Sequence, residues 1–181
     1  MTWSRHAALI ASAVGVACGG AESAEPAASP QATSFVAFAR DFDGFEAWNA
    51  FPLGVGEAAP GEISGPRTVY ASRLPAPGEA EVPVGTRLVK VIGDGPVESR
   101  QVFAMAKLGG DYNAFGARGW EWFELKRDAT GALSIDWRGI SPPEGTSYGT
   151  NIRGGACNEC HLERGAATDA VLTPGVAPVS R

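Results

Sequence analysis

Residues 86–92 read TRLVKVI and residues 101–108 read QVFAMAKL, and these two stretches decide the fold class of this 181-residue chain. Each is a short run dominated by apolar residues, with the length of a β-strand rather than of a helix. Between them lies Gly93-Asp94-Gly95-Pro96, whose residue types interrupt regular structure and favour a turn. The two stretches therefore predict antiparallel strands of one sheet.

Three further runs of this kind lie at residues 67–72, 120–127 and 133–137, again separated by Gly-rich turns. Toward the N-terminus, aromatic residues recur at steps of three and four positions, which predicts one amphipathic helix that begins at Ser34 and buries its aromatic face. These residues are Phe35, Phe38, Phe42, Phe45 and Trp48. A second, short helix is expected over residues 156–164. The expected fold is α+β and mainly β: an antiparallel sheet with one N-terminal amphipathic helix and one short C-terminal helix.

The expected C-terminal helix contains the most specific motif of the chain, Cys157-Asn158-Glu159-Cys160-His161. The pattern Cys-X-X-Cys-His is the attachment signature of a c-type haem. Two thiols about one helical turn apart each bond to a vinyl group of the porphyrin, and the adjacent histidine binds the iron from the same side. We therefore expect Cys157 and Cys160 to attach haem c and His161 to be an axial ligand of its iron.

Two other interpretations of the cysteine pair stay open. The pair could be half of a zinc site, but the chain has no second pair, and a histidine directly after a cysteine is poorly placed to share a tetrahedral ion with both sulfurs. It could also be a thioredoxin-like redox pair, although no strand precedes it and no βαβ pattern surrounds it.

The N-terminus predicts export. Residues 1–17 hold Arg5, a short apolar run and no acidic residue, which is typical of a signal peptide and too short for a permanent membrane span. Cys18 follows at the place where a bacterial lipoprotein is cleaved and lipidated, and an ordinary signal peptide cleaved nearby is the alternative. We expect a periplasmic protein, or one anchored to a bacterial membrane through a lipid on Cys18.

The rest of the chain divides into three parts. Residues 18–33 are small, polar or Pro-rich and are expected to form a disordered tether. Residues 34–174 are long enough for one compact domain with its own core, and residues 175–181 are expected to form a tail. The formal net charge is −5 and becomes about −6 without residues 1–17, which argues against nucleic acid or an anionic membrane surface as a partner.

The position of the motif excludes the familiar cytochrome classes. A small electron-transfer cytochrome usually has its haem motif near the N-terminus and a methionine ligand downstream, whereas no methionine or histidine follows His161 here. The four-helix cytochromes do have a C-terminal haem motif, but this chain lacks four long helical patterns. A sheet protein with a C-terminal haem motif remains.

That combination resembles the cytochrome P-460 family and its relatives, the cytochromes c′-beta, over roughly residues 65–174. The resemblance rests on a series of segments in a fixed order: residues 67–70, 84–90, 105–107, 119–124, 157–161 and 168–173. It implies a homodimer of antiparallel sheets with a five-coordinate haem. Members of the family oxidise hydroxylamine or bind nitric oxide and other small gases.

The resemblance also implies roles for two pocket residues. Lys90 lies where the hydroxylamine-oxidising members have a lysine bonded to the porphyrin, while a lysine that extends from a strand end to solvent is the plainer interpretation. Phe103 lies where those enzymes have a pocket glutamate, four residues before the lysine matched by Lys107. A phenylalanine there is the pattern of the gas-binding relatives, and it offers no proton acceptor for an oxidation.

The few histidines and methionines of the chain limit which side chain could occupy the sixth coordination position of the iron. His6 lies in the expected signal peptide, so His161 is the only imidazole of the mature chain. Met105, on the same strand face as Phe103 and Lys107, is expected to line the core or the pocket, and a thioether ligand is the alternative. Arg67 is a candidate pocket cation for an anion or a haem propionate, or a solvated charge at a strand end.

Three functions follow as expectations. The first is a c-type monohaem protein with an open distal site that binds nitric oxide or a similar small ligand. The second is a haem-dependent oxidoreductase that acts on hydroxylamine, with Lys90 bonded to the macrocycle. The third is an electron-transfer cytochrome with a redox partner, which an open axial site disfavours.

Overall fold

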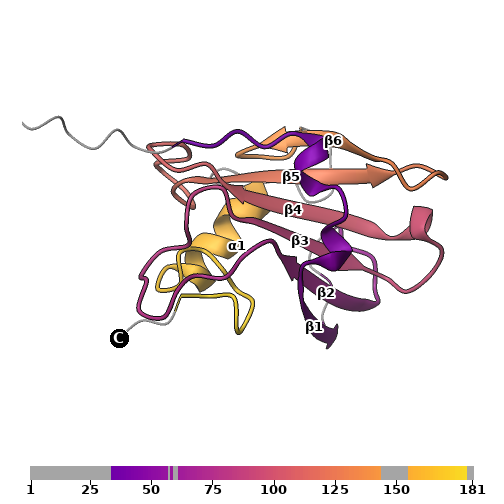
Figure 1. The fold of residues 1–181 in the computed structure, drawn as a ribbon, viewed down its shortest axis with the longest axis horizontal. Helices are drawn as coiled ribbons and strands as arrows, with labels where there is room; N and C mark the ends of the chain where they lie inside the picture. Colours follow the sequence, from indigo (N-terminus) through magenta and orange to yellow (C-terminus); the bar gives the residue numbers. More distant parts are fainter. Residues whose placement is uncertain (1–33, 57, 59–60, 144–154, 179–181) are drawn as a thin grey trace, which may run out of the picture. The chain divides into compact units, whose positions relative to one another are not determined.

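A computed structural model describes residues 34–56, 58, 61–143 and 155–178. Within this part of the chain, six strands form one antiparallel sheet in which each strand pairs with the next along the sequence (Figure 1). The strands are β1 (Asn49–Val55), β2 (Pro66–Ala71), β3 (Arg87–Ile92), β4 (Gln101–Lys107), β5 (Trp120–Arg127) and β6 (Leu133–Gly139). The mainly β, antiparallel fold predicted from the sequence is confirmed.

The five strands expected from apolar runs all occur, with bounds that differ by two residues at most. The additional strand β1 was not expected. It pairs with β2, and its register shifts between Pro52 and Gly54. These two residues interrupt the alternating pattern by which a strand is recognised, and β1 lies at the edge of the sheet, where a proline is tolerated.

The N-terminal aromatic segment is not the single amphipathic helix that its spacing predicted. It forms two short 3₁₀ helices, η1 (Ala39–Phe42) and η2 (Phe45–Ala47), before β1 begins. Gly44 between them has φ 66°, a left-handed conformation that ends a helix. Phe42, the last residue of η1, and Phe45, the first residue of η2, are both buried.

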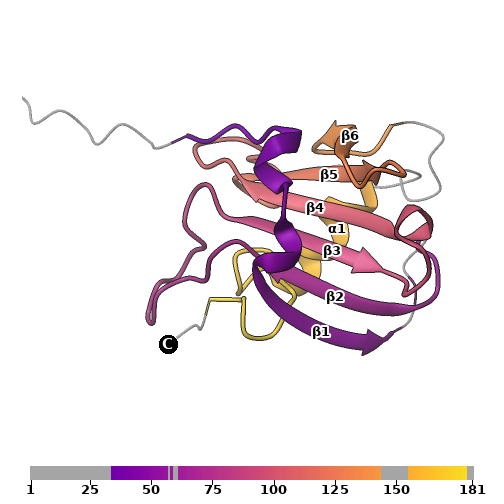
Figure 2. The same cartoon turned by 45° about the vertical axis from the view of Figure 1, so that its right-hand side comes forward.

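The two faces of the sheet are covered by different parts of the chain (Figure 2). The aromatic segment covers one face, where Phe42 and Phe45 pack on a cluster that includes Val89 and Phe123. The other face carries a second cluster that includes Met105. Because side chains alternate along a strand, Leu88, Lys90 and Ile92 lie on this second face of β3, as do Phe103, Met105 and Lys107 on β4.

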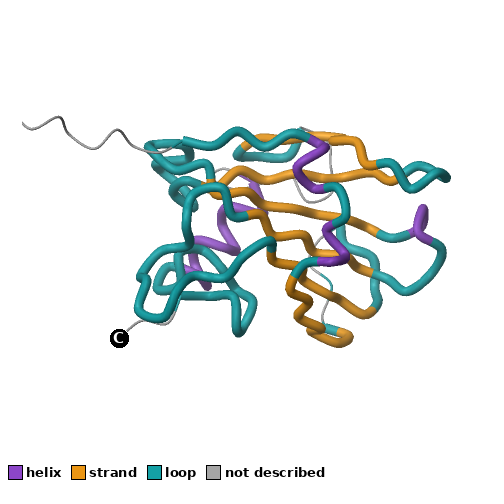
Figure 3. The backbone as a smooth tube through the Cα atoms, in the orientation of Figure 1, coloured by secondary structure: helices purple, strands orange, loops and turns teal. Residues whose placement is uncertain are grey.

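The second face is covered by helix α1 (Gly155–Gly165) and by the segment of residues 166–178 that follows it. That segment is drawn as loop in Figure 3, yet Val171 and Val176 are fully buried in the core of this face. The core therefore extends beyond residue 174, where the sequence analysis placed the end of the domain. A third short 3₁₀ helix, η3 (Val97–Ser99), lies between β3 and β4.

The predicted signal peptide, the tether and Cys18 lie outside the described residues. No helix among the residues that are described has the length and apolar character needed to cross a membrane.

Candidate functional site

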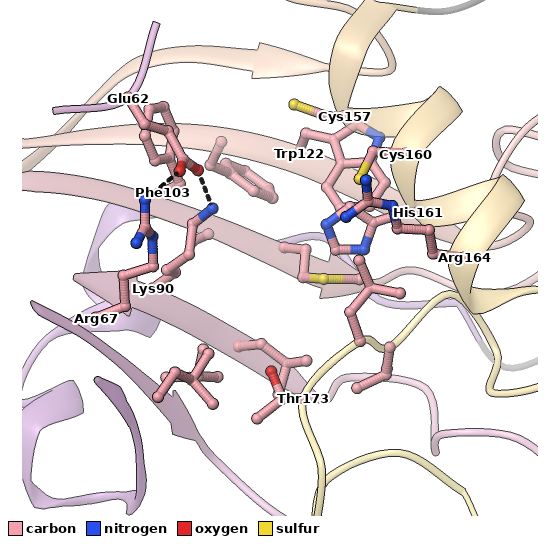
Figure 4. Close-up of a pocket in the computed structure, with 18 residues that line it drawn as sticks. Glu62, Arg67, Lys90, Phe103, Trp122, Cys157, Cys160, His161, Arg164 and Thr173 are labelled. Carbon is pink, nitrogen blue, oxygen red and sulfur yellow. Dashed lines mark hydrogen bonds and ion pairs between the residues drawn. The ribbon is translucent and has the colours of Figure 1, made fainter. Parts of the chain in front are cut away.

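A cavity of about 370 Å³ lies on the second face of the sheet, between the strands and α1. Its volume falls in the range of small-molecule sites. Most of its lining is apolar, including Val69, Leu88, Trp122 and Val171. Figure 4 shows two groups of functional side chains in this cavity, one from α1 and one from β2, β3 and the loop before β2.

The first group consists of Cys157, Cys160 and His161, which all line the cavity. Positions i, i+3 and i+4 of a helix lie on one side, so this side of α1 faces the cavity. The next residue that α1 contributes to the lining is Arg164, again three positions further along. The three functional residues of the motif that the sequence singled out therefore all line one cavity.

Asn158, between the two cysteines, fixes α1 against the sheet. Its side chain is 2% exposed, and its Oδ1 accepts hydrogen bonds from Trp122 Nε1 at 3.0 Å and from the Ala117 backbone N–H at 3.2 Å. Asn113 and Asn158 also exchange two amide hydrogen bonds, of 2.6 and 2.9 Å. Because each buried polar group is satisfied, the network holds the helix in one orientation.

His161 is held in a defined tautomer. Its Nδ1 lies 2.7 Å from the carbonyl oxygen of Ala170, and since a carbonyl only accepts, Nδ1 carries the proton. Nε2 then keeps its lone pair. The imidazole packs 4.6 Å from the Trp122 ring, and burial lowers the pKa of His161 to about 4. A neutral imidazole with a free Nε2 lone pair is the form that binds a metal.

Cys157 and Cys160 are half-buried free thiols. Burial raises the pKa of Cys157 to about 11, although the nearby Lys90 ammonium acts in the opposite direction. A catalytic redox cysteine needs the opposite, a lowered pKa that yields thiolate at neutral pH. Within the described ranges, no group of three or more His, Cys, Asp and Glu side chains is placed to hold a metal ion.

The second group is a polar cluster of Glu62, Arg67 and Lys90 at the other end of the cavity (Figure 4). Glu62 lies in the loop before β2, and its side chain is only 9% exposed. One carboxylate oxygen accepts a hydrogen bond from Arg67 at 3.2 Å, and the other forms an ion pair with the Lys90 ammonium. Arg67 also donates to the Gly56 carbonyl at 2.7 Å.

Phe103 and Met105 complete the set of residues that the sequence pointed to. Phe103 is paired with Lys90 across β3 and β4, and the Lys90 Nζ lies 5.5 Å from the centre of its ring. Met105 is buried and lines the same cavity. All the described candidates, from three strands and one helix, therefore meet at one cavity.

Sequence reasoning missed Glu62, Asn158 and Trp122. Glu62 lies in a loop rich in small residues, where no periodicity indicates which side chains face inward. Asn158 occupies an X position of the motif, which the attachment chemistry leaves free. Trp122 is an apolar strand residue like its neighbours in sequence. Only the fold brings them to the cysteines and the histidine.

Searches with this chain against protein-family models, curated proteins and solved structures return no match.

Proposed function

We propose that this chain is an exported c-type monohaem protein, with haem bonded to Cys157 and Cys160 and its iron bound by His161. The observation that carries the proposal is the convergence of two free thiols and one neutral imidazole, at helix spacing, on a single largely apolar cavity. The donor set fits the group: Nε2 of His161 keeps its lone pair because Nδ1 is bonded to Ala170. A haem supplies an iron centre that binds small ligands and exchanges electrons.

We further propose that the site binds nitric oxide or another small neutral ligand at the open iron position. His161 is the only imidazole outside residues 1–17, so a second histidine ligand would have to come from the expected signal peptide. Phe103 and the aliphatic side chains favour a small neutral molecule, because an anion would have to be desolvated among them, while the cluster of Glu62, Arg67 and Lys90 adds one net positive charge at the other end of the cavity.

The proposal is tested on protein purified from a host that attaches haem c. We expect covalent haem that survives acid-acetone extraction, a five-coordinate high-spin ferrous spectrum, and binding of nitric oxide. Cys157→Ala/Cys160→Ala should lose nearly all covalent haem, whereas the neighbouring exposed Leu162→Ala should retain it. Wild-type protein that carries no haem, or a double variant that keeps it, would contradict the proposal.

A second candidate function is the oxidation of hydroxylamine. The observation that favours it is Glu62, because this carboxylate supplies the proton acceptor that Phe103 does not. In this case Lys90 would be bonded to the macrocycle, and a haem peptide from a digest would contain residues from β3 as well as from α1. Steady turnover with an electron acceptor, lost in Glu62→Gln, would favour the enzyme. A haem peptide from α1 alone, with no turnover, would favour the binding protein.

A further inference from the structure

The second face of the sheet also contains a buried ion pair that does not line the cavity. Lys107, at the end of β4, is 5% exposed, and its Nζ lies 2.5 Å from Oδ1 of Asp169, in the segment after α1. Nζ also donates to the Arg118 carbonyl at 3.0 Å, and Oδ2 of Asp169 accepts from the Val82 N–H at 2.8 Å. Both charges are thus paired and hydrogen-bonded, which is the condition for burying them.

Asp169 belongs to a strained piece of backbone. Asp169 and the next residue, Ala170, have φ values of 50° and 62°. The left-handed conformation costs a residue with a Cβ about 1–2 kcal/mol, so two in succession persist only where surrounding contacts impose them. Two contacts hold the backbone in this conformation: Trp120 Nε1 donates to the Asp169 carbonyl at 2.8 Å, and the Ala170 N–H donates to the Gly165 carbonyl at 2.8 Å.

Gly165 at the end of α1 permits this turn. A Cβ at that position would lie 2.7 Å from the Cα of Ala170, closer than real Cβ atoms approach. The chain therefore turns back directly against the helix end. As a result, the carbonyl of Ala170 reaches Nδ1 of His161 at 2.7 Å.

We propose that the Lys107–Asp169 pair is a positioning device, which holds the Ala170 carbonyl on Nδ1 of His161 and so sets how strongly Nε2 donates electrons to the iron. This inference rests on the proposed function, since it requires His161 to bind haem iron. A hydrogen bond from Nδ1–H to a fixed acceptor orients the ring and makes the opposite nitrogen a stronger donor. Without the pair, the strained turn relaxes and the carbonyl moves away from Nδ1.

If the Lys107–Asp169 pair only stabilised the fold, breaking it would lower the melting temperature without changing the iron–histidine bond. A second ion pair of the chain serves as the control for this distinction. Arg138 and Glu121 form this second ion pair, with contacts of 2.5 and 2.9 Å, in which the Glu121 side chain is buried and the Arg138 side chain is 33% exposed. Arg138 also donates to the Ala37 carbonyl at 2.7 Å, so this pair ties the N-terminal segment to the opposite face of the sheet. Breaking it removes the charged partner of a buried carboxylate without touching the segment that contacts His161.

The experiment compares wild type, Asp169→Asn, Lys107→Met and Arg138→Met as haem-bearing proteins. The measurements are melting temperature, the ferrous iron–histidine stretching frequency by resonance Raman, and the midpoint potential. We expect all three variants to melt at lower temperature than wild type. Only Asp169→Asn and Lys107→Met should shift the stretch to lower frequency and raise the midpoint potential, because weaker donation stabilises the ferric iron less. Asp169→Asn keeps the shape of the side chain, so it gives the measurement if Lys107→Met does not fold.

The measurements distinguish failure of the proposed function from failure of the positioning role alone. A wild-type protein with no covalent haem, or with no iron–histidine band, overturns the proposed function and this inference with it. A haem-bearing wild type whose Asp169→Asn variant melts earlier but keeps the wild-type frequency and potential overturns the positioning role alone. A shift in Arg138→Met equal to that in Asp169→Asn also overturns it, because general loosening of the fold would then explain both.

Discussion

At the scale of single residues, Glu62 gives the cavity a negative charge and a proton acceptor in a place where the sequence indicated only apolar and cationic side chains. Arg67 and Lys90 both contact its carboxylate, so the polar cluster carries a formal charge of one positive unit. In a partly dehydrated cavity each of these charges acts more strongly than it would in water. The cluster should therefore control which ligands enter.

Replacing Glu62 by glutamine should favour anionic ligands. The change removes the only acidic group of the cluster while keeping its shape, so cyanide should bind the ferric protein about tenfold more tightly, or by about 1.4 kcal/mol. Nitric oxide is neutral, and its affinity for the ferrous protein should stay within about twofold. Spectral titration gives both values. Asp111→Asn, which removes one charge from a side chain that is 86% exposed, is the control and should leave both affinities unchanged.

Met105 is the thioether available inside the domain, and we expect it to fill space rather than to bind iron. It is 6% exposed and packs in the same cluster as Trp122 and Leu88. Leucine has a similar volume, so Met105→Leu should cost less than about 1.5 kcal/mol and leave the ferrous optical spectrum unchanged. A low-spin ferrous wild type that becomes high-spin in Met105→Leu would instead identify Met105 as the sixth ligand.

At the scale of elements, the hydrogen bonds of Asn158 hold α1 in position against the sheet. The helix has eleven residues, several of them charged or polar, and a helix of this length is marginal in isolation. Asn158 gives it a buried point of attachment to β5 through Trp122, and to the loop before β5 through Asn113 and Ala117. The position of the cysteines and of His161 follows from this attachment.

Asn158→Ala should therefore destabilise the protein and loosen the helix. The change leaves the N–H groups of Trp122 and Ala117 without their acceptor, and unsatisfied buried groups cost about 1–3 kcal/mol each. We expect a loss of about 3 kcal/mol in urea unfolding and faster amide hydrogen exchange in α1. Glu159→Ala, the other X position of the motif, is half-buried and should cost less than about 1 kcal/mol. Equal losses in the two variants would contradict the role given to Asn158.

The elements differ in how well the sequence predicted them, and the reasons are local. Strands β2 to β6 were predicted because each is a short apolar run bounded by turn residues. Strand β1 was missed because Pro52 and Gly54 break its pattern at the register shift. The aromatic segment was predicted as one helix from its spacing of three and four residues, but the left-handed Gly44 divides it into two short 3₁₀ helices.

At the scale of the whole molecule, the candidate site was predicted in part. The motif named Cys157, Cys160 and His161, and strand parity placed Lys90 with Leu88 and Met105 with Phe103. The contacts that give these residues their chemistry are long-range: Glu62 reaches Lys90 over 28 positions, and Asp169 reaches Lys107 over 62. No local pattern encodes such contacts, because they depend on how the loops close over the finished sheet.

The folded molecule as a whole should lose stability in mild acid because of His161. Burial lowers its pKa from 6.5 to about 4. Above pH 6.5 the imidazole is neutral in the folded and the unfolded chain, so it adds no pH dependence. As the pH falls from 6.5 to 4, the unfolded chain takes up a proton that the folded chain does not, and unfolding becomes easier. The loss levels off below pH 4 at about 3 kcal/mol.

This dependence is measured on haem-free protein, made as Cys157→Ala/Cys160→Ala, by urea unfolding between pH 7.5 and 4. The same chain with His161→Leu is the reference, since all other titrating groups are common to both. The difference between the two free energies of unfolding should be constant above pH 6.5 and should shift in favour of His161→Leu as the pH falls. A constant difference over the whole range would mean that His161 takes up its proton equally well in the folded chain. The imidazole would then be open to solvent, which would contradict the buried position that it has in the structure and on which the proposed haem site rests.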